Sequence, residues 1–331
     1  MTETADFYKE LFQSGKVENK KRRAIWKEVL DIPSSFTPTI APTTDHRDFK
    51  QVEKDVNRSF LHLQDSDFKT RRRQQLLNVI LSVLERHAPL HYCQGIHHIA
   101  SIILTFAREP LAMLIFERLA LGPLLPFLQE NLEGLASMMN FVMPIIKLVD
   151  PELWQHFDEN DFDTSYYTAP YIVSWFVPQA SSLEVALKYL DFFVISNPIM
   201  PVYLIVAYTL HRKSEFMSKY DYEAISQVSD NITHGIDPDV CINRAIEIFK
   251  QFPPVVVLNN NPKLFISKNL TLLNPRVDYP FPFPTFPKAQ LLPHNIYEKH
   301  LSDEKSDSKL ITGILSALTI LGAIGLRILE L

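Results

Sequence analysis

The sequence predicts an all-α protein, and three observations lead to that prediction. Hydrophobic residues make up 46% of the 331 residues, which is enough to build a large buried core. Eight glycines stand against 23 prolines; β-rich folds need many glycine turns, whereas helical folds need few and accept proline at helix starts and in linkers. Apolar residues also recur at steps of three and four, which is the period of a helix with one buried face.

The predicted helices form one domain over residues 20–255, after a polar segment over 1–19. The first is a short helix over 22–30. The next covers 48–63, and one of its faces carries apolar residues at steps of four, four and three: Val52, Val56, Phe60 and Leu63. Further helices are predicted, between Pro, Asp and Asn residues that separate them, over 71–87, 95–107, 111–120, 131–148, 165–176 and 183–193.

An apolar stretch over 194–210 has two interpretations, a membrane span or a buried helix. Asn197, Pro198 and Pro201 interrupt it, whereas a membrane-spanning helix needs about 20 consecutive apolar residues. A buried core helix that starts near Pro201 is therefore the better interpretation.

The rest of the chain divides into a tether and an anchor. Residues 256–309 are rich in proline, which prevents a regular helix, so we expect an extended tether that partly packs back on the domain through its Phe residues. Residues 310–326 carry no charge, and as a helix they reach roughly 26 Å, near the thickness of a thin bilayer core. The alternative is a buried terminal helix, but the segment is apolar all round. We therefore assign 310–331 as a C-terminal transmembrane helix.

The charge balance argues against a nucleic-acid partner. The chain carries 33 basic and 38 acidic residues, a formal net charge of −5, which gives no positive field to attract a phosphate backbone. Its two cysteines, Cys93 and Cys241, are too few for a disulfide framework and form no C-x-x-C pair. A reducing compartment fits this cysteine usage best.

Residues 90–98, LHYCQGIHH, crowd reactive side chains into nine positions. Metal binding by His91, His97 and His98 is disfavoured, because adjacent helical residues point about 100° apart and no H-E-x-x-H motif is present. Cys93 needs a spatially close histidine to act as a nucleophile, which proximity in sequence does not establish. Glycine-rich phosphate loops are also absent from the sequence, so we expect the chain to bind no cofactor or metal of its own.

Gln94 and Gly95 form a corner between two predicted helices. Pro89 ends the first helix and the second begins close behind it, so the Gln94 side chain projects from a short turn. Gly95 lets another surface approach closely. A neutral amide in such a place can orient a water molecule through its oxygen and donate through its nitrogen, but it cannot take a proton.

Arg58 is the cation that could complete such a site. On a helical wheel with Val52 at zero, Arg58 falls at about 240° and Asp55 at about 300°, so Arg58 faces away from the apolar stripe. Asp55 lies three residues earlier and is placed to hold the guanidinium. The alternative is an ordinary solvated arginine with an acidic neighbour three residues away.

Four motifs in chain order resemble those of the TBC domain family of Rab GTPase-activating proteins. The arginine-finger motif I-x-x-D-x-x-R is matched by Val52, Asp55 and Arg58, and the glutamine-finger motif Y-x-Q-G by Tyr92, Gln94 and Gly95. An early R-x-x-x-W and a later block are matched by Arg22, Trp26, Ser174, Trp175, Phe176 and Asp191. Further stretches, such as MPII at 143–146 and NPIMPVY at 197–203, are similar to the endoplasmic-reticulum-anchored type within that family.

The resemblance implies that Arg58 and Gln94 act in trans on a Rab GTPase of ER-to-Golgi traffic, by similarity the Rab one or Rab two type. Asp55 would orient Arg58, while Tyr92 and Gly95 would fix the glutamine corner. GTP and magnesium would belong to the Rab partner. The same resemblance implies an endoplasmic reticulum membrane location, with the helical domain in the cytosol.

Two positions depart from the family pattern. His98 stands where the glutamine-finger motif commonly continues to Asp, and Leu190 stands where many members have Trp. Neither replaces a finger residue, but loss of the Asp could alter how the glutamine loop is braced. A membrane-tethered Rab-binding scaffold with a TBC fold and little activity is therefore the alternative function.

Overall fold

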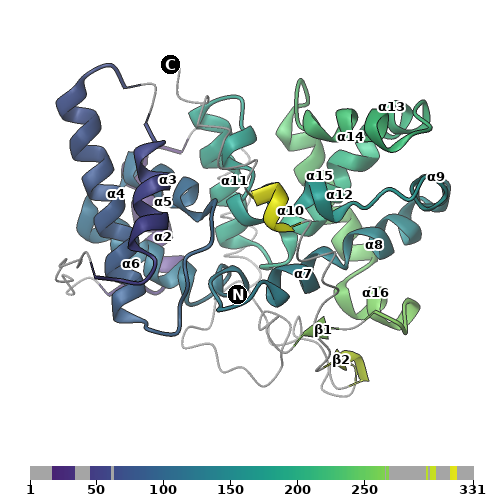
Figure 1. Cartoon of the computed structure of the whole chain (residues 1–331), viewed down its shortest axis with the longest axis horizontal. Coiled ribbons are helices and arrows are strands. Elements are labelled where there is room, and N and C mark those ends of the chain that lie inside the picture. The colour runs from purple at the N-terminus through teal and green to yellow at the C-terminus, as the bar shows by residue number, and fades with distance from the viewer. Residues whose placement is uncertain are drawn as a thin grey trace.

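The computed structural model describes residues 17–33, 45–60, 63–264, 266–267, 296, 299–302 and 314–318. Apart from short connections and one two-residue strand pair, the described chain is helical (Figure 1). Its helices are α2 (Asn19–Val29), α3 (Phe49–Asn57), α4 (Ser66–Arg86), α5 (Ile96–Phe106), α6 (Glu109–Ala120), α7 (Glu133–Met139), α8 (Val142–Val149), α9 (Pro151–Glu159), α10 (Ser165–Ser174), α11 (Leu183–Ile195), α12 (Met200–His211), α13 (Lys213–Met217), α14 (Tyr222–Asp230), α15 (Pro238–Gln251) and α16 (Pro254–Asn260). The prediction of an all-α domain is confirmed.

Helix α5 lies at the centre of the packing. It contacts α2, α3, α4 and α6 on one side of the molecule and α10 and α11 on the other (Figure 1). Ten of its eleven residues are buried, because a helix surrounded by other helices has no face left for water. Helix α12 plays the same role in the second half, where it packs against α8, α10 and α15.

Prolines and acidic residues start many of these helices. Proline stands in the first turn of α6, α9, α12, α15 and α16, where the missing N–H leaves no intrahelical bond unmade. Asp65, Asp150 and Asp221 cap α4, α9 and α14 by accepting hydrogen bonds from backbone N–H groups of the first turn. In the described chain, several prolines thus stand at helix starts, which the composition analysis allowed for.

The apolar stretch over 194–210 is a buried core helix and not a span. Helix α12 begins at Met200, with Pro201 in its first turn, and its residues through Thr209 are all buried among other helices. This prediction is confirmed. Of the residues that the structure describes, no helix combines the length and the apolar character that crossing a membrane requires.

Three details of the predicted helices are wrong. The helix expected over 48–63 ends at Asn57, and Phe60 is buried through a left-handed turn, with φ of 57°, instead of through helical periodicity. The helix expected over 131–148 is two helices, α7 and α8, which a turn at Asn140 separates. Helices α9 and α13 to α15 were not predicted.

The tether also begins differently from the prediction. Residues 254–260 form α16, because Pro254 stands in the first turn, where proline does not break a helix. Part of the remainder does pack back on the domain: Ile266 and Ser267 pair in parallel with Leu301 and Ser302. Ser267 donates its backbone N–H to Ser137 of α7 over 3.0 Å. The Phe residues expected to make this contact lie outside the described residues, as do residues 268–295, 297–298 and 303–309 of the tether.

The predicted anchor and the polar segment over 1–19 are described only in part. Of residues 310–331, the structure describes 314–318, which form a helical turn that packs on the domain. The other residues of the anchor lie outside the described part of the chain, so the transmembrane helix stays a prediction.

A buried ion pair joins the first helix to α11. Arg22 lies next to Asp191, with its Nε 3.0 and 3.1 Å from the two carboxylate oxygens, and Trp26 donates its indole N–H to the same carboxylate over 2.8 Å. Both partners of the ion pair are almost completely buried. Trp26 packs its ring edge-on against Phe106 of α5, so this cluster fixes α2 against α5 and α11.

We predict that replacing Arg22 by Met destabilises the domain strongly. The change would leave the Asp191 carboxylate buried without its cation, which typically costs about 3 to 5 kcal/mol. The free energy of unfolding in urea measures the effect. Arg244→Met is the matched control: its ion pair with Glu247 is exposed and should contribute less than about 1 kcal/mol. Equal losses for the two variants would contradict the role given to the buried pair.

Candidate functional site

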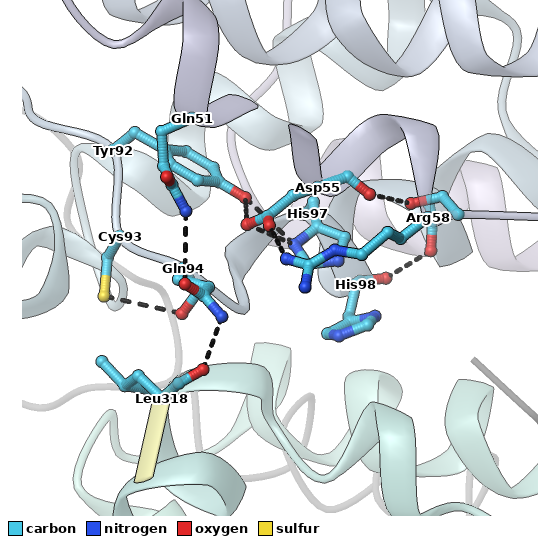
Figure 2. A network of polar contacts seen from close by, with 11 residues as sticks. Gln51, Asp55, Arg58, Tyr92, Cys93, Gln94, His97, His98 and Leu318 are labelled. Carbon is cyan, nitrogen blue, oxygen red and sulfur yellow. Dashed lines mark hydrogen bonds and ion pairs between the residues drawn. The ribbon is translucent and has the colours of Figure 1, made fainter. Parts of the chain in front are cut away.

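The carboxylate of Asp55 is the centre of the candidate site. It lies on α3 and is completely buried. One of its oxygens forms an ion pair with the Arg58 guanidinium, and the other accepts a hydrogen bond from the Tyr92 hydroxyl over 2.7 Å. The Nδ1 atom of His97 lies 3.5 Å from that second oxygen. One carboxylate therefore contacts both predicted motifs (Figure 2).

Arg58 lies at the end of α3. It is the residue that follows the last helical turn, and its backbone N–H still bonds to Asp55 of that turn. Its side chain is 32% exposed, so the guanidinium is neither buried in the core nor fully extended into solvent. Its Nε atom is buried and has no hydrogen-bond partner among the described residues, so only the exposed part of the guanidinium could reach an external anion.

The loop that carries Gln94 is held by the start of α3. The Arg47 guanidinium donates to the backbone carbonyls of Ala88 and Leu90 over 2.7 and 2.5 Å, and the Asp48 carboxylate accepts the backbone N–H of Tyr92 over 2.9 Å. These bonds join residues more than 40 positions apart. They fix the loop of the glutamine motif against the helix of the arginine motif.

Gly95 gives the corner its shape. Its φ of 105° lies in the left-handed region. This conformation is strained for a residue with a side chain, whereas glycine adopts it freely. Helix α5 begins at the next residue, Ile96. The predicted sharp turn between Pro89 and the following helix is therefore present, with glycine at the position that requires it.

Both ends of the Gln94 carboxamide have partners within the chain. Its Oε1 accepts a hydrogen bond from Gln51 over 3.2 Å, and its Nε2 donates to the backbone carbonyl of Leu318 over 2.5 Å (Figure 2). The Gln94 residue is half-buried. Arg58 and Gln94 thus each bond to a side chain of α3, Asp55 for Arg58 and Gln51 for Gln94.

Two histidines of this segment, His97 and His98, are held neutral. Burial, assisted by the nearby Arg58 charge, lowers the pKa of His97 to about 3 and that of His98 well below its usual range. The Tyr92 hydroxyl has one proton, and this proton makes the hydrogen bond to Asp55. The Nδ1 atom of His97, 3.0 Å from that hydroxyl, therefore carries a proton and donates it to the tyrosine oxygen.

The two other chemistries considered for residues 90–98 have no support in the geometry. The His97 nitrogen that faces the site bonds to Tyr92, and the described chain contains no group of three or more His, Cys, Asp or Glu side chains that could hold a metal ion. Cys93 is buried, and burial raises the pKa of its thiol to about 12, so at neutral pH the sulfur is not a thiolate nucleophile.

Sequence reasoning missed four residues of this site. Arg47 donates to the backbone of the glutamine loop. Gln51 and Asp48 contact the glutamine loop directly, and His97 was considered only as a metal ligand. The helical wheel held a signal for Gln51: one position before Val52, it falls at about 260°, next to Arg58 at about 240°. The contact between Asp48 and Tyr92 spans 44 positions, and no local pattern reports it.

Comparison with solved structures identifies the class of fold. The chain is similar to the crystal structure of the Chlamydomonas flagellar RabGAP TBC domain, with a TM-score of 0.56, 18% identity, and coverage of 72% of this chain and 82% of that one. It is also similar to the Ypt/Rab-GAP domain of Gyp1p, with a TM-score of 0.51 and 14% identity over 70% of this chain and 80% of that one. The helical domain therefore has the TBC fold.

Comparison of sequences identifies the family. The family model of the Rab-GTPase-TBC domain matches residues 19–217, which is more than half of the chain. TBC1 domain family member 20 from Homo sapiens is 28% identical over 249 residues, 73% of this chain and 62% of that protein. The GTPase-activating protein gyp10 of Schizosaccharomyces pombe is 29% identical over 175 residues, 53% of this chain and 47% of that protein. The chain belongs to the Rab-GTPase-TBC domain family and spans less than two thirds of the length of these relatives.

We predict that His97 makes the domain sensitive to acid. An unfolded histidine takes up a proton near pH 6.5, whereas folded His97 stays neutral down to a pKa of about 3. Between these values the unfolded state binds more protons, so stability is lost as the pH falls. From pH 7 to pH 5, the wild type should lose about 2 kcal/mol more unfolding free energy than His97→Gln.

Urea unfolding at the two pH values measures this difference. His234→Gln, at an exposed histidine, is the control and should lose as much as the wild type. If His97→Gln has the same pH dependence as the wild type, His97 is not held neutral by the fold.

Proposed function

We propose that this protein accelerates GTP hydrolysis by Rab GTPases, with Arg58 and Gln94 as the two groups it supplies. The observation that carries the proposal is the Asp55 carboxylate, which contacts both Arg58 and Tyr92 and so couples the arginine motif to the glutamine loop. Membership in the Rab-GTPase-TBC domain family supports it. So do the names of the relatives, one of which is a GTPase-activating protein.

The chemistry suits these two side chains. Phosphoryl transfer needs little covalent help, so positioning and electrostatic stabilisation dominate. A guanidinium offers a permanent charge and a planar set of donors to the phosphate oxygens, and the Arg58 side chain is partly exposed. A carboxamide cannot accept a proton, so Gln94 would orient the attacking water in place of the GTPase's own glutamine.

The supporting residues have distinct tasks in this proposal. Asp55 orients Arg58, and its buried carboxylate is itself held by the Tyr92 hydroxyl. Tyr92 and Gly95 fix the turn that presents Gln94. The chain binds no cofactor of its own, since the GTP and its magnesium ion belong to the Rab.

The partner class and location are proposed from sequence similarity. The match to TBC1 domain family member 20 in three mammals and the resemblance to the endoplasmic-reticulum-anchored type support Rabs of ER-to-Golgi traffic, of the Rab one and Rab two types. The uncharged run over 310–326 supports a C-terminal anchor in the endoplasmic reticulum membrane, with the helical domain in the cytosol.

One observation favours a second function, a Rab-binding scaffold with little activity. His98 replaces the Asp that commonly follows the glutamine finger, and it is buried against His97 with ring centroids 3.9 Å apart. Within the described chain neither of its ring nitrogens has a hydrogen-bond partner. A neutral ring braces the loop by packing alone, whereas a carboxylate would brace it by charge.

We predict that Arg58→Ala lowers Rab GTP hydrolysis stimulated by this protein at least about a hundredfold, because an arginine finger supplied in trans is worth about 10³ to 10⁵ in rate. Single-turnover hydrolysis across a panel of Rabs measures it. Arg244→Ala, which removes an exposed arginine from a comparable ion pair on α15, is the control and should retain full stimulation. Equal hydrolysis with Arg58→Ala and wild type would exclude the arginine-finger role.

We predict a smaller but clear loss for Gln94→Ala in the same assay, since the GTPase's own glutamine can partly replace the missing amide. The melting temperature of the variant should match that of the wild type, because Gln94 is half-buried on a loop. A chain that binds GTP-loaded Rab but stimulates none of the panel would establish the scaffold function instead.

We predict that the full chain resists alkaline extraction from cell membranes, as expected for an inserted helix. Replacing Ile320 and Leu321, in the middle of the uncharged run, by Lys should release it, since each charge at the centre of a span costs about 3 kcal/mol of insertion free energy. Complete release of the wild type by carbonate would argue against the anchor.

A further inference from the structure

Residues 314–318 lie against the glutamine loop as one helical turn, shown in yellow at the centre of Figure 1. Three of their side chains belong to the hydrophobic core of the domain: Ile314 is fully buried, Ala317 is 2% exposed and Leu318 is 4% exposed. Leu315 of the same turn is 53% exposed. The segment therefore packs one definite face on the domain.

This turn contacts the group that the proposed function needs most. The Leu318 carbonyl accepts the hydrogen bond from Gln94 Nε2, and these residues are 224 positions apart. Figure 2 shows the Gln94 side chain between Gln51 and Leu318. With its oxygen bonded to Gln51, the carboxamide has its oxygen and one of its two N–H groups engaged inside the chain.

A glutamine in this state is not ready to act on a GTPase. To orient a water beside a bound nucleotide, the amide must present its oxygen and nitrogen to that water. The Leu318 carbonyl already takes one N–H of this amide. Ile314, Ala317 and Leu318 are buried on the domain beside that contact, so the surface that they cover is not open to water.

We propose that residues 314–318 form an autoinhibitory plug, which docks on the surface around Gln94 and competes with the Rab for it. The plug is the chain's own segment, and binding of the plug and of the GTPase exclude each other. Because residues 314–318 also belong to the uncharged run of the proposed anchor, they dock on the domain only in molecules whose anchor is not inserted in a bilayer. This inference rests on the proposed function, because it assigns a means of control to the same side chain.

The physical basis is a two-state equilibrium. When the plug is docked, Ile314, Ala317 and Leu318 are withdrawn from water, which favours the closed state. The stimulated rate then scales with the fraction of molecules in the open state. A substitution that makes burial of Ile314, Ala317 or Leu318 less favourable should therefore raise the rate of stimulated Rab hydrolysis. A substitution on the exposed face of the turn should not.

Leu318→Glu in the full chain tests the plug, with Leu315→Glu as the matched control. The two substitutions change the same residue type to the same charge in the same turn, but only the first places a carboxylate in the buried face. We expect Leu318→Glu to raise stimulated Rab hydrolysis at least about fivefold in detergent-free buffer, by populating the open state. Leu315→Glu should match the wild type.

Hydrogen exchange of the full chain without Rab gives an independent readout. Residues 91–95 and 314–318 should exchange slowly in the wild type and in Leu315→Glu, and quickly in Leu318→Glu. Ile314→Glu should behave as Leu318→Glu does in both assays. Together these results would support the plug.

Two other outcomes separate the plug from the proposed function. If wild type, Leu318→Glu and Leu315→Glu stimulate hydrolysis equally, the plug is excluded and the activity stands. If hydrogen exchange is faster in Leu318→Glu than in Leu315→Glu but no variant stimulates hydrolysis by any Rab, the proposed GTPase-activating function is excluded. The segment then contacts Gln94 but inhibits no activity.

Discussion

The site depends on one buried carboxylate. Taking a charged group out of water costs several kcal/mol unless partners compensate it, and Asp55 is completely buried. Its partners are the Arg58 guanidinium, the Tyr92 hydroxyl and the ring of His97. Because they come from the end of α3, the loop and the start of α5, satisfying one charge brings three segments together. The need to pair Asp55 thus places Arg58 beside the loop that presents Gln94.

Two further contacts in the structure also provide partners for buried or half-buried polar groups. Asp191 is a second buried carboxylate, which Arg22 and Trp26 hold, and it fixes α2 to α11 on the two sides of α5. The Leu318 carbonyl meets the need of a half-buried amide for a partner. Residues 314–318 thereby have two possible apolar surroundings, the surface around Gln94 and, as part of the uncharged run over 310–326, a lipid bilayer. Occupying one excludes the other.

The sequence predicted what depends on local spacing. Proline positions and apolar periodicity gave most helices and the buried α12, and the spacing of Asp55 and Arg58 by three residues predicted their contact. What it did not predict depends on tertiary structure. The early end of α3 at Asn57 follows from the left-handed turn at Phe60, and the bonds from Arg47 and Asp48 to the loop join distant residues. The contact between Gln94 and Leu318 could not be predicted from periodicity, because the two residues are 224 positions apart and the acceptor is a backbone carbonyl.

A structure of the full chain with a Rab that holds GDP and aluminium fluoride, a mimic of the transferring phosphoryl group, tests the central claim most directly. The account predicts that Arg58 reaches the fluoride while Asp55 remains buried against Tyr92, that Gln94 contacts the attacking water, and that residues 314–318 have left the glutamine loop. A complex in which the Rab docks elsewhere, with the Gln94 amide still bonded to Leu318 and Arg58 away from the nucleotide, would contradict it.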